Sequence, residues 1–291
     1  MTHKALVPGR AAVITGGASG IGLATAQKLA LLGMKICIAD ISEGALRSAS
    51  ESIADITGGS AEVLAVTCDV SRMEDVERLR DKAYSAFGEV GFLMNNAGTE
   101  GGGQLFGDTA RWRQIIDVNL WGVINGIQIF LPTMLAQGND CAVVNTGSKQ
   151  GITCPPGDTA YNISKAGIKV VTEALAHELR NIASCRISAH LLIPGFTFTG
   201  FTRIHTQTKP DAAWTPEQVV DFMFAAMDEG DFYILCPDNS VTREVDEARM
   251  RWAMDDIVAN RPPLSRWHKD HANAFSDFLE AALAKEKSGG R

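Results

Sequence analysis

Short apolar runs alternate with longer helical patterns along most of this 291-residue chain, and this alternation restricts the possible folds more than any other feature. The apolar runs predict strands near residues 11–15, 35–39, 62–67, 90–94, 141–146, 186–193 and 231–236. The stretches between them predict helices near residues 21–32, 43–55, 73–87, 109–136, 159–182 and 215–229. Strands joined through helices form right-handed crossovers and lie parallel in one sheet. We therefore expect an α/β protein with a doubly wound, seven-stranded parallel sheet and helices on both faces.

Two regions fall outside this alternation. Residues 196–214 form a long connection rich in Thr and aromatic residues, and connections of this length are usually lids or binding loops. After Asp238 the chain shows two more helical patterns, separated by an Arg-Pro-Pro break at 261–263. We expect one domain over residues 1–240 and a helical C-terminal extension over 241–291 that packs on it.

Charge and cysteine content argue against several classes of protein. The chain has 34 acidic and 27 basic residues and no run of five basic ones, which disfavours nucleic acid or an anionic membrane surface as partner. We expect no membrane span, because no apolar stretch reaches about 18 residues, and no signal peptide, because the N-terminus lacks an apolar segment. The six cysteines form no CxxC pair, so we expect reduced thiols in a cytoplasmic protein.

A glycine-rich turn at residues 15–22, TGGASGIG, lies between the first predicted strand and helix. Glycines let the backbone approach a pyrophosphate, and the helix N-terminus offers free N–H groups, although such a turn can also merely connect two elements. The next strand ends in Asp40, whose carboxylate can accept hydrogen bonds from ribose hydroxyls and would repel a 2′-phosphate. Ile41 supplies no cation to hold such a phosphate. Asp40 could alternatively be a solvated loop residue or a helix cap.

Other predicted strands also end in polar or glycine residues. The third ends in Asp69-Val70, the fourth in Asn95-Asn96-Ala97-Gly98, the fifth in 145–148 and the sixth in Pro194-Gly195. Ligands of open α/β sheets bind outside the carboxyl ends of the strands. A dinucleotide bound to a Rossmann-type sheet requires polar and glycine residues at this edge, whereas packing of the core does not.

Tyr161 and Lys165 form the most specific pair. Residues four apart lie on one helix face, so the Lys165 ammonium can approach the Tyr161 hydroxyl. Free tyrosine has a pKa near 10, and a nearby cation lowers the pKa towards a useful range for a base. Ser148, at the end of the fifth strand, could hydrogen-bond the reacting oxygen. Taken alone, a Tyr-x-x-x-Lys pattern is most often an exposed helix face.

Together these motifs resemble the short-chain dehydrogenase/reductase family in its single-domain branch, over roughly residues 8–240. The family's catalytic tetrad corresponds to Asn119, Ser148, Tyr161 and Lys165. The resemblance implies that Tyr161 is the acid/base, Lys165 holds the nicotinamide ribose and lowers the Tyr161 pKa, Ser148 orients the substrate, and Asn119 anchors a water. It implies a cofactor site formed by Gly16, Ser19, Gly20, Ile21, Gly22, Asp40, Ile41, Asp69, Val70, Asn96, Ala97, Gly98, Tyr161, Lys165, Pro194, Gly195, Thr197 and Thr199.

We therefore predict an NAD-dependent oxidoreductase that interconverts a secondary alcohol and a ketone. An NADP-linked carbonyl reductase, with Arg47 or Lys35 reaching the 2′-phosphate, and a non-catalytic dinucleotide sensor are the alternatives. A moderately apolar substrate is suggested by Phe196, Phe198, Phe201 and Trp214 in the long connection.

Two further expectations concern metals and assembly. His268 and His271 have helical spacing, but no third ligand is evident, so no metal is predicted. The helices over 109–136 and 159–182 carry more apolar residues than one sheet face needs. In the resembling family these helices form a four-helix interface, which implies a homotetramer or homodimer.

Overall fold

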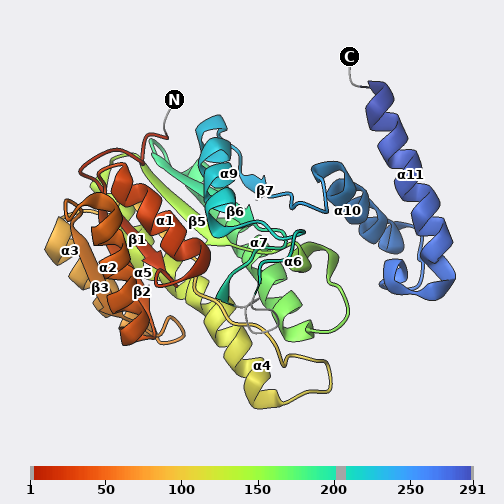
Figure 1. The fold of residues 1–291 in the computed structure, drawn as a ribbon, viewed down its shortest axis with the longest axis horizontal. Helices are drawn as coiled ribbons and strands as arrows, with labels where there is room; N and C mark the ends of the chain where they lie inside the picture. Colours follow the sequence, from red (N-terminus) through yellow and green to blue (C-terminus); the bar gives the residue numbers. More distant parts are fainter. Residues whose placement is uncertain (1–2, 201–207, 290–291) are drawn as a thin grey trace.

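A computed structural model describes residues 3–200 and 208–289, and its centre is one all-parallel sheet of seven strands in the order β3-β2-β1-β4-β5-β6-β7 (Figure 1). The order reverses direction between β1 and β4, as a doubly wound Rossmann-type sheet requires. The predicted fold class is confirmed. The strands are β1 (Ala11–Thr15), β2 (Lys35–Asp40), β3 (Val63–Thr67), β4 (Phe92–Asn95), β5 (Cys141–Thr146), β6 (Ile187–Ile193) and β7 (Tyr233–Leu235).

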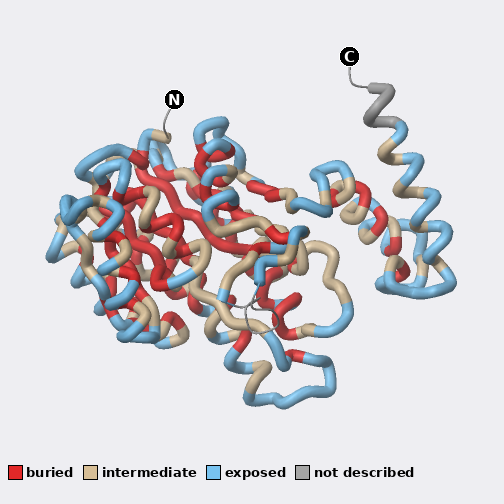
Figure 2. Tube along the Cα trace, viewed as in Figure 1, coloured by how far each residue is buried: buried red, intermediate tan, exposed pale blue. Residues whose placement is uncertain are grey.

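Three helices cover each face of the sheet. On one face, the apolar sides of α1 (Gly20–Leu31), α2 (Glu43–Thr57) and α9 (Pro216–Glu229) pack on the even-numbered residues of β1 and β2. On the other face, α3 (Met73–Phe87), α5 (Gly122–Gln137) and α7 (Thr159–Asn181) pack on the odd-numbered residues of these two strands. The central strands β1, β4 and β5 are buried along their whole length, which explains their uninterrupted apolar sequences (Figure 2).

The helix predicted over 109–136 contains an interruption. It consists of α4 (Thr109–Ile116), a π-helical turn η1 (Asp117–Trp121) and α5. By length and composition, the run Thr109–Gln137 could cross a membrane, but Phe130 and Met134 pack into the core, so it is a core helix. A one-turn helix, α6 (Gln150–Thr153), begins two residues after Ser148 and was not predicted.

The chain beyond β7 forms a helical arm, which we call the C-terminal arm (residues 243–289). It contains α10 (Arg243–Val258), two 3₁₀ turns, η2 (Ser265–Trp267) and η3 (Lys269–His271), and α11 (Ala272–Gly289). Trp252 of α10 stacks edge-on against aromatic rings of α11 and donates a hydrogen bond to Ser265 (2.8 Å). α10 contacts α6, whereas α11 projects away from the sheet (Figure 1). The division into a domain over 1–240 and an extension over 241–291 stays a prediction.

Candidate active site

The glycine-rich turn packs tightly against the loop that follows β4. Gly16 adopts φ +62°, and a Cβ atom there would lie 2.8 Å from the Ala97 Cα atom. A Cβ atom on Gly22 would lie 2.2 Å from the Gly16 carbonyl oxygen. Side chains at either position would therefore push the backbone apart. The turn lies at the carboxyl edge of the sheet, as the sequence predicted.

Asn96 joins the ends of three strands at this edge. Its amide nitrogen Nδ2 donates to the Thr15 and Gly16 carbonyl oxygens (3.2 and 3.3 Å), and its Oδ1 accepts from the Thr146 hydroxyl (3.2 Å). The Thr15 hydroxyl also accepts the backbone N–H groups of Asn96 and Ala97. These bonds hold the glycine-rich turn against the loop after β4, so the Asn96 side chain shapes the turn.

The N-terminus of α1 fits the pyrophosphate of a dinucleotide. Ser19 is the N-cap with extended backbone, no described side chain caps the helix, and the first turn has no acidic residue. The first N–H groups of the helix, around Gly20 and Ile21, can therefore donate to an anion. From the other side, a Cβ atom on Gly20 would lie 3.3 Å from the Thr199 methyl group. The predicted residues Ser19, Gly20 and Thr199 thus lie together.

Asp40 ends β2, next to this turn. Its Oδ1 accepts the backbone N–H of Ser42 (3.2 Å), while Ser42 itself caps α2. The Ile41 side chain is 69% exposed. Lys35, considered as a partner for a 2′-phosphate, begins the same strand about 16 Å away and forms an ion pair with Glu62. Lys35 is therefore at the wrong end of β2 for that role.

The Asp69-Val70 pair lies after β3 in a hydrogen-bonded turn. Asp69 Oδ1 accepts from the backbone N–H and the hydroxyl of Ser71 (3.0 and 2.7 Å). The Val70 carbonyl oxygen accepts from Asn125 Nδ2 of α5 (2.9 Å), and the Val70 side chain is buried. The pair thus forms part of the same strand-end edge as the other predicted cofactor residues.

Tyr161, Lys165 and Ser148 meet in a buried site at the start of α7. Asp158 caps this helix by accepting the Tyr161 backbone N–H (3.2 Å). Lys165 Nζ donates to the Thr146 carbonyl oxygen (2.8 Å) and lies 5.6 Å from the Tyr161 ring centroid. Ser148 lies near enough to Tyr161 to lower the pKa of its hydroxyl. The three residues that the sequence predicted to lie together, Tyr161, Lys165 and Ser148, are therefore neighbours in the structure.

Burial controls the protonation of this site. It raises the pKa of Tyr161 above its ordinary value, Glu100 and Asp158 raise it further, and the hydrogen bond with Ser148 lowers it. Burial likewise lowers the pKa of Lys165 to about 8, against the opposing charge of Glu100. Burial is the largest cause of both shifts, because desolvation favours the neutral form of each group, and the expectation that Lys165 lowers the Tyr161 pKa stays a prediction.

Asn119 lies in the π-helical turn and is fully buried. Its Oδ1 accepts the Thr99 backbone N–H (2.7 Å), and its Nδ2 donates to the Thr99 carbonyl oxygen (2.9 Å) and to the Ser164 hydroxyl (3.0 Å). The Ser164 hydroxyl in turn donates to the Tyr161 carbonyl oxygen. The side chain of Asn119 therefore holds the loop after Gly98 against the helix that carries Tyr161.

The segment after β6 closes the other side of the site. Thr197 is buried and pairs with Trp214, and the Phe198 N–H donates to the Trp214 carbonyl oxygen (2.8 Å). Phe196 is 42% exposed. Phe201, predicted to line the substrate site, lies outside the described residues. A Cβ atom on Gly195, which follows Pro194, would lie 2.8 Å from both Asp238 Oδ2 and Lys149 Nζ.

Sequence reasoning did not identify several residues that position this site. Asp158, Thr146 and Ser164 all act on the Tyr161–Lys165 pair, and Lys149 bridges to the C-terminal arm. Only Asp158 had a local signal, since Asp before a helical pattern is a common N-cap. Thr146 and Lys149 act through contacts between distant parts of the chain, whereas the Ser164 hydroxyl bonds within its own helix. In the arm, the His268 and His271 rings lie 6.1 Å apart with no third ligand among the described residues.

A doubly wound sheet with a glycine cradle and a buried Tyr–Lys pair at its carboxyl edge defines a Rossmann-type oxidoreductase. The family model described as short chain dehydrogenase matches residues 10–210. The chain belongs to the short-chain dehydrogenase/reductase family.

Known relatives are similar over most of the chain. The 1-deoxy-11-beta-hydroxypentalenate dehydrogenase of Streptomyces exfoliatus is 33% identical over 87% of this chain and 91% of its own. A family member from Burkholderia phymatum, solved in complex with NAD, has a TM-score of 0.78 and 35% identity over 88% of this chain and 96% of its own. A putative short-chain dehydrogenase from Novosphingobium aromaticivorans has a TM-score of 0.75 and 26% identity, covering 98% of this chain and 100% of its own.

Proposed function

We propose that this chain is an NAD-dependent oxidoreductase that interconverts a secondary alcohol and a ketone, with Tyr161 as general acid/base. The observation that carries the proposal is the buried contact of Tyr161 with Ser148, beside Lys165. A tyrosine hydroxyl held in a desolvated site, with a serine donor next to it, is suited to exchanging a proton with a bound oxygen.

NAD would be held along the carboxyl edge of the sheet. The turn at Gly16–Gly22 and the N-terminus of α1 would take the pyrophosphate, and Asp40 would accept the adenosine ribose hydroxyls. When bound, the cofactor supplies the hydride acceptor or donor and, when oxidised, a positive charge. The NAD complex of the similar Burkholderia phymatum protein supports this choice. So does the position of Lys35, far from Asp40.

The chain's own residues would move the proton. Tyr161 removes it from an alcohol or delivers it to a ketone, and Ser148 orients the substrate oxygen by a hydrogen bond. The high pKa of Tyr161 keeps the proton in place for ketone reduction at neutral pH. Lys165 hydrogen-bonds the cofactor ribose, and Asn119 anchors a water that carries the proton towards solvent.

The substrate would be moderately apolar. Phe196, Phe198 and Trp214 lie on the segment that covers the site, and aromatic side chains favour apolar ligand surface. The dehydrogenase of Streptomyces exfoliatus is named for a hydroxylated substrate, in line with an alcohol as the reacting group.

A substrate screen tests this proposal. Purified protein is incubated with a panel of secondary alcohols and NAD, or ketones and NADH, while nicotinamide absorbance is followed. The same panel is run with NADP and NADPH. Turnover with NAD and at least one apolar member is expected. Turnover with the phosphorylated cofactors alone would show that Asp40 does not select the cofactor, and NAD binding without any turnover would favour a sensor.

Assembly through α5 and α7 follows from the same proposal. Trp121 beside α5, and Ile163 and Val170 on α7, expose 48%, 46% and 62% of their surfaces. Burying such apolar side chains against a second copy would stabilise a homodimer or homotetramer. Light scattering of the wild type and of Val170→Lys tests this, and the variant should shift towards the monomer. We also propose a cytoplasmic location, since all six cysteines are free.

A further inference from the structure

Lys149 directly follows Ser148, and its side chain connects three separate parts of the chain. Its ammonium Nζ lies 2.5 Å from Asp246 Oδ2 of α10 and 3.4 Å from Asp238 Oδ2 after β7. The side chains of Lys149, Asp238 and Asp246 are only 18%, 6% and 7% exposed. Burying charges costs desolvation energy, so a buried ion pair is weak evidence for added stability. Its place in the fold points instead to a positioning role.

The element that Lys149 begins, α6, lies between two residues of the candidate active site. Lys149 is the N-cap of α6, and the Ser148 hydroxyl oxygen accepts the Gln150 N–H (3.2 Å). On its other side, a Cβ atom on Gly151 would lie 2.4 Å from the Lys165 carbonyl carbon. A shift of α6 would therefore move Ser148 relative to Lys165.

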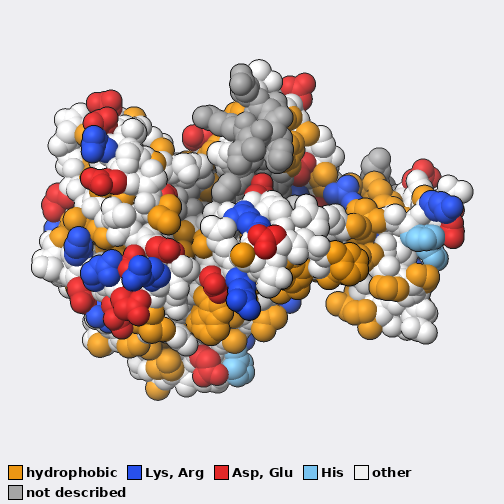
Figure 3. All heavy atoms as spheres, turned by 90° about the horizontal axis from the view of Figure 1, so that it is seen from below, with side chains coloured by type: hydrophobic (Ala, Val, Ile, Leu, Met, Phe, Trp, Pro, Cys, Tyr) orange, Lys and Arg blue, Asp and Glu red, His pale blue; other side chains and the backbone are white. Residues whose placement is uncertain are grey.

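The C-terminal arm holds α6 from outside. α10 contacts α6, and Met250 of α10 packs against the apolar cluster that also receives Ile152. Arg249 lies 3.7 Å from the second carboxylate oxygen of Asp246, which gives the buried network two cations and two carboxylates. Apolar side chains gather where the arm joins the domain (Figure 3). The ionic and apolar contacts thus act on the same short helix.

We propose that the C-terminal arm fixes α6 through the Lys149–Asp246 pair, and that both are positioning residues for Ser148. The inference rests on the proposed function, because it concerns the contact of Ser148 with the reacting oxygen. Loosening α6 should slow the chemical step, since a misplacement of about 1 Å can cost on the order of 100-fold in rate. Cofactor binding along β1 and β2 should change little.

A competing route runs through Asp238. Its Oδ2 accepts the Phe196 N–H (3.3 Å) and lies against Gly195, in the segment after β6 that is predicted to form part of the cofactor site. If Lys149 acted chiefly on this segment, its loss would weaken NAD binding and leave Ser148 in place. The test must separate the two routes.

The experiment compares Lys149→Met, Lys149→Arg and Lys149→Met in a Ser148→Ala background. We expect Lys149→Met to lower kcat about tenfold, Lys149→Arg to restore it to within about twofold, and the double variant to be no slower than Ser148→Ala alone. NAD dissociation constants from calorimetry should stay within about twofold. Lys169→Met, which removes a surface ion pair with Glu173, is the matched control and should leave kcat unchanged.

Two kinetic outcomes would overturn the proposal. One is an equal loss of rate from Lys149→Met with and without Ser148, and the other is a rise in the NAD dissociation constant that accounts for the lost rate. Hydrogen exchange gives a readout independent of turnover: Lys149→Met and Asp246→Asn should both speed exchange at the α6 amides but not in α1. Unchanged exchange at the α6 amides would contradict the proposal that the C-terminal arm fixes α6. A wild type without NAD-linked turnover would contradict the proposed function instead.

Discussion

At the scale of single residues, burial determines the chemistry of the site. Tyr161 and Lys165 stand close together, yet desolvation raises the pKa of one and lowers that of the other. Tyr161 therefore stays protonated beside Ser148 and can donate a proton, whereas a Lys165 pKa of about 8 leaves most of that ammonium charged at neutral pH. Asp40 differs, since it lies at the rim and can present a charge to a ribose.

The first prediction concerns Asp40. Replacing Asp40 with Asn removes the charge that accepts the ribose hydroxyls, and a charge-assisted hydrogen bond is worth about 1.5–3 kcal/mol. NAD affinity should therefore fall roughly 10- to 100-fold, and NADP affinity should rise because the repulsion of the 2′-phosphate is gone. Calorimetric titration with both cofactors measures this. The control is Glu43→Gln, which removes an exposed acidic residue at the start of α2, three residues after Asp40. If the control changes both affinities as much as Asp40→Asn does, Asp40 does not bind the ribose.

At the scale of elements, the π-helical turn η1 links the loop after β4 to α7. From this turn the Asn119 side chain makes two hydrogen bonds with the Thr99 backbone and one with the Ser164 hydroxyl. π-helical turns inside α-helices are frequent at functional sites because they re-aim one residue. Here the turn directs Asn119 at the loop that carries Gly98.

The second prediction tests this link. Asn119→Ala leaves the partly buried Thr99 N–H and C=O groups without their Asn119 partner, and an unsatisfied buried group costs about 1–3 kcal/mol at most. Denaturant unfolding should show a loss of that size, whereas Asn273→Ala, at an exposed site in α11, should change stability by less than about 0.5 kcal/mol. A stability loss no larger than in the control would mean that water replaces the Asn119 amide.

The elements also show how far sequence can lead. Apolar strand sequences and a capping-box start at Thr215 predicted the sheet and most helices, because burial on both faces and local caps leave local signals. The i, i+4 spacing placed Lys165 beside Tyr161. One turn of helix at α6 has no periodicity to detect. The Lys149–Asp246 contact joins residues far apart in the chain, so no local sequence pattern predicts it.

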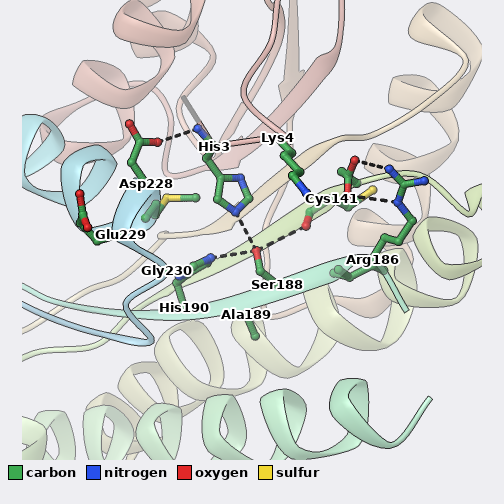
Figure 4. Close-up of a pocket in the computed structure, with 13 residues that line it drawn as sticks. His3, Lys4, Cys141, Arg186, Ser188, Ala189, His190, Asp228, Glu229 and Gly230 are labelled. Atoms are coloured by element: carbon green, nitrogen blue, oxygen red, sulfur yellow. Dashed lines mark hydrogen bonds and ion pairs between the residues drawn. The ribbon is translucent and has the colours of Figure 1, made fainter. Parts of the chain in front are cut away.

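At the scale of the whole molecule, the candidate active site lies at the carboxyl ends of the strands, and a second pocket lies at the other end of the sheet. This pocket is lined by His3, Ser188 and His190, among others (Figure 4). Ser188 Oγ lies 2.8 Å from His190 Nε2 and 3.2 Å from His3 Nε2, and His190 Nδ1 lies 2.7 Å from the Asp231 carbonyl oxygen. These bonds attach the N-terminal segment to β6. Asp228, Asp140 and Lys4 are the charged groups that act on His3.

The third prediction is a pH dependence of stability. Burial lowers the pKa of His190 and of His3 in the folded chain, so protonation favours the unfolded state. The stability that the two neutral histidines contribute to the folded state is complete above the ordinary histidine pKa near 6.5, and it is lost as pH falls below that value. Thermal unfolding between pH 8 and 5 should show this decline, and His190→Gln should flatten it. His177→Gln, an exposed histidine of α7, should not. An unchanged slope in His190→Gln would exclude this titration.

The most direct test of the central claim compares Tyr161→Phe with the wild type in two measurements, NAD binding and turnover of a substrate found by screening. Removing one hydroxyl should leave the NAD dissociation constant within about twofold and lower kcat by ~10²–10⁴, the range of general acid–base catalysis. Tyr233→Phe, whose hydroxyl contacts Glu173 at the surface, should behave as wild type. If Tyr161→Phe turns over its substrate at the wild-type rate, Tyr161 is not the acid/base, and the proposed mechanism is wrong.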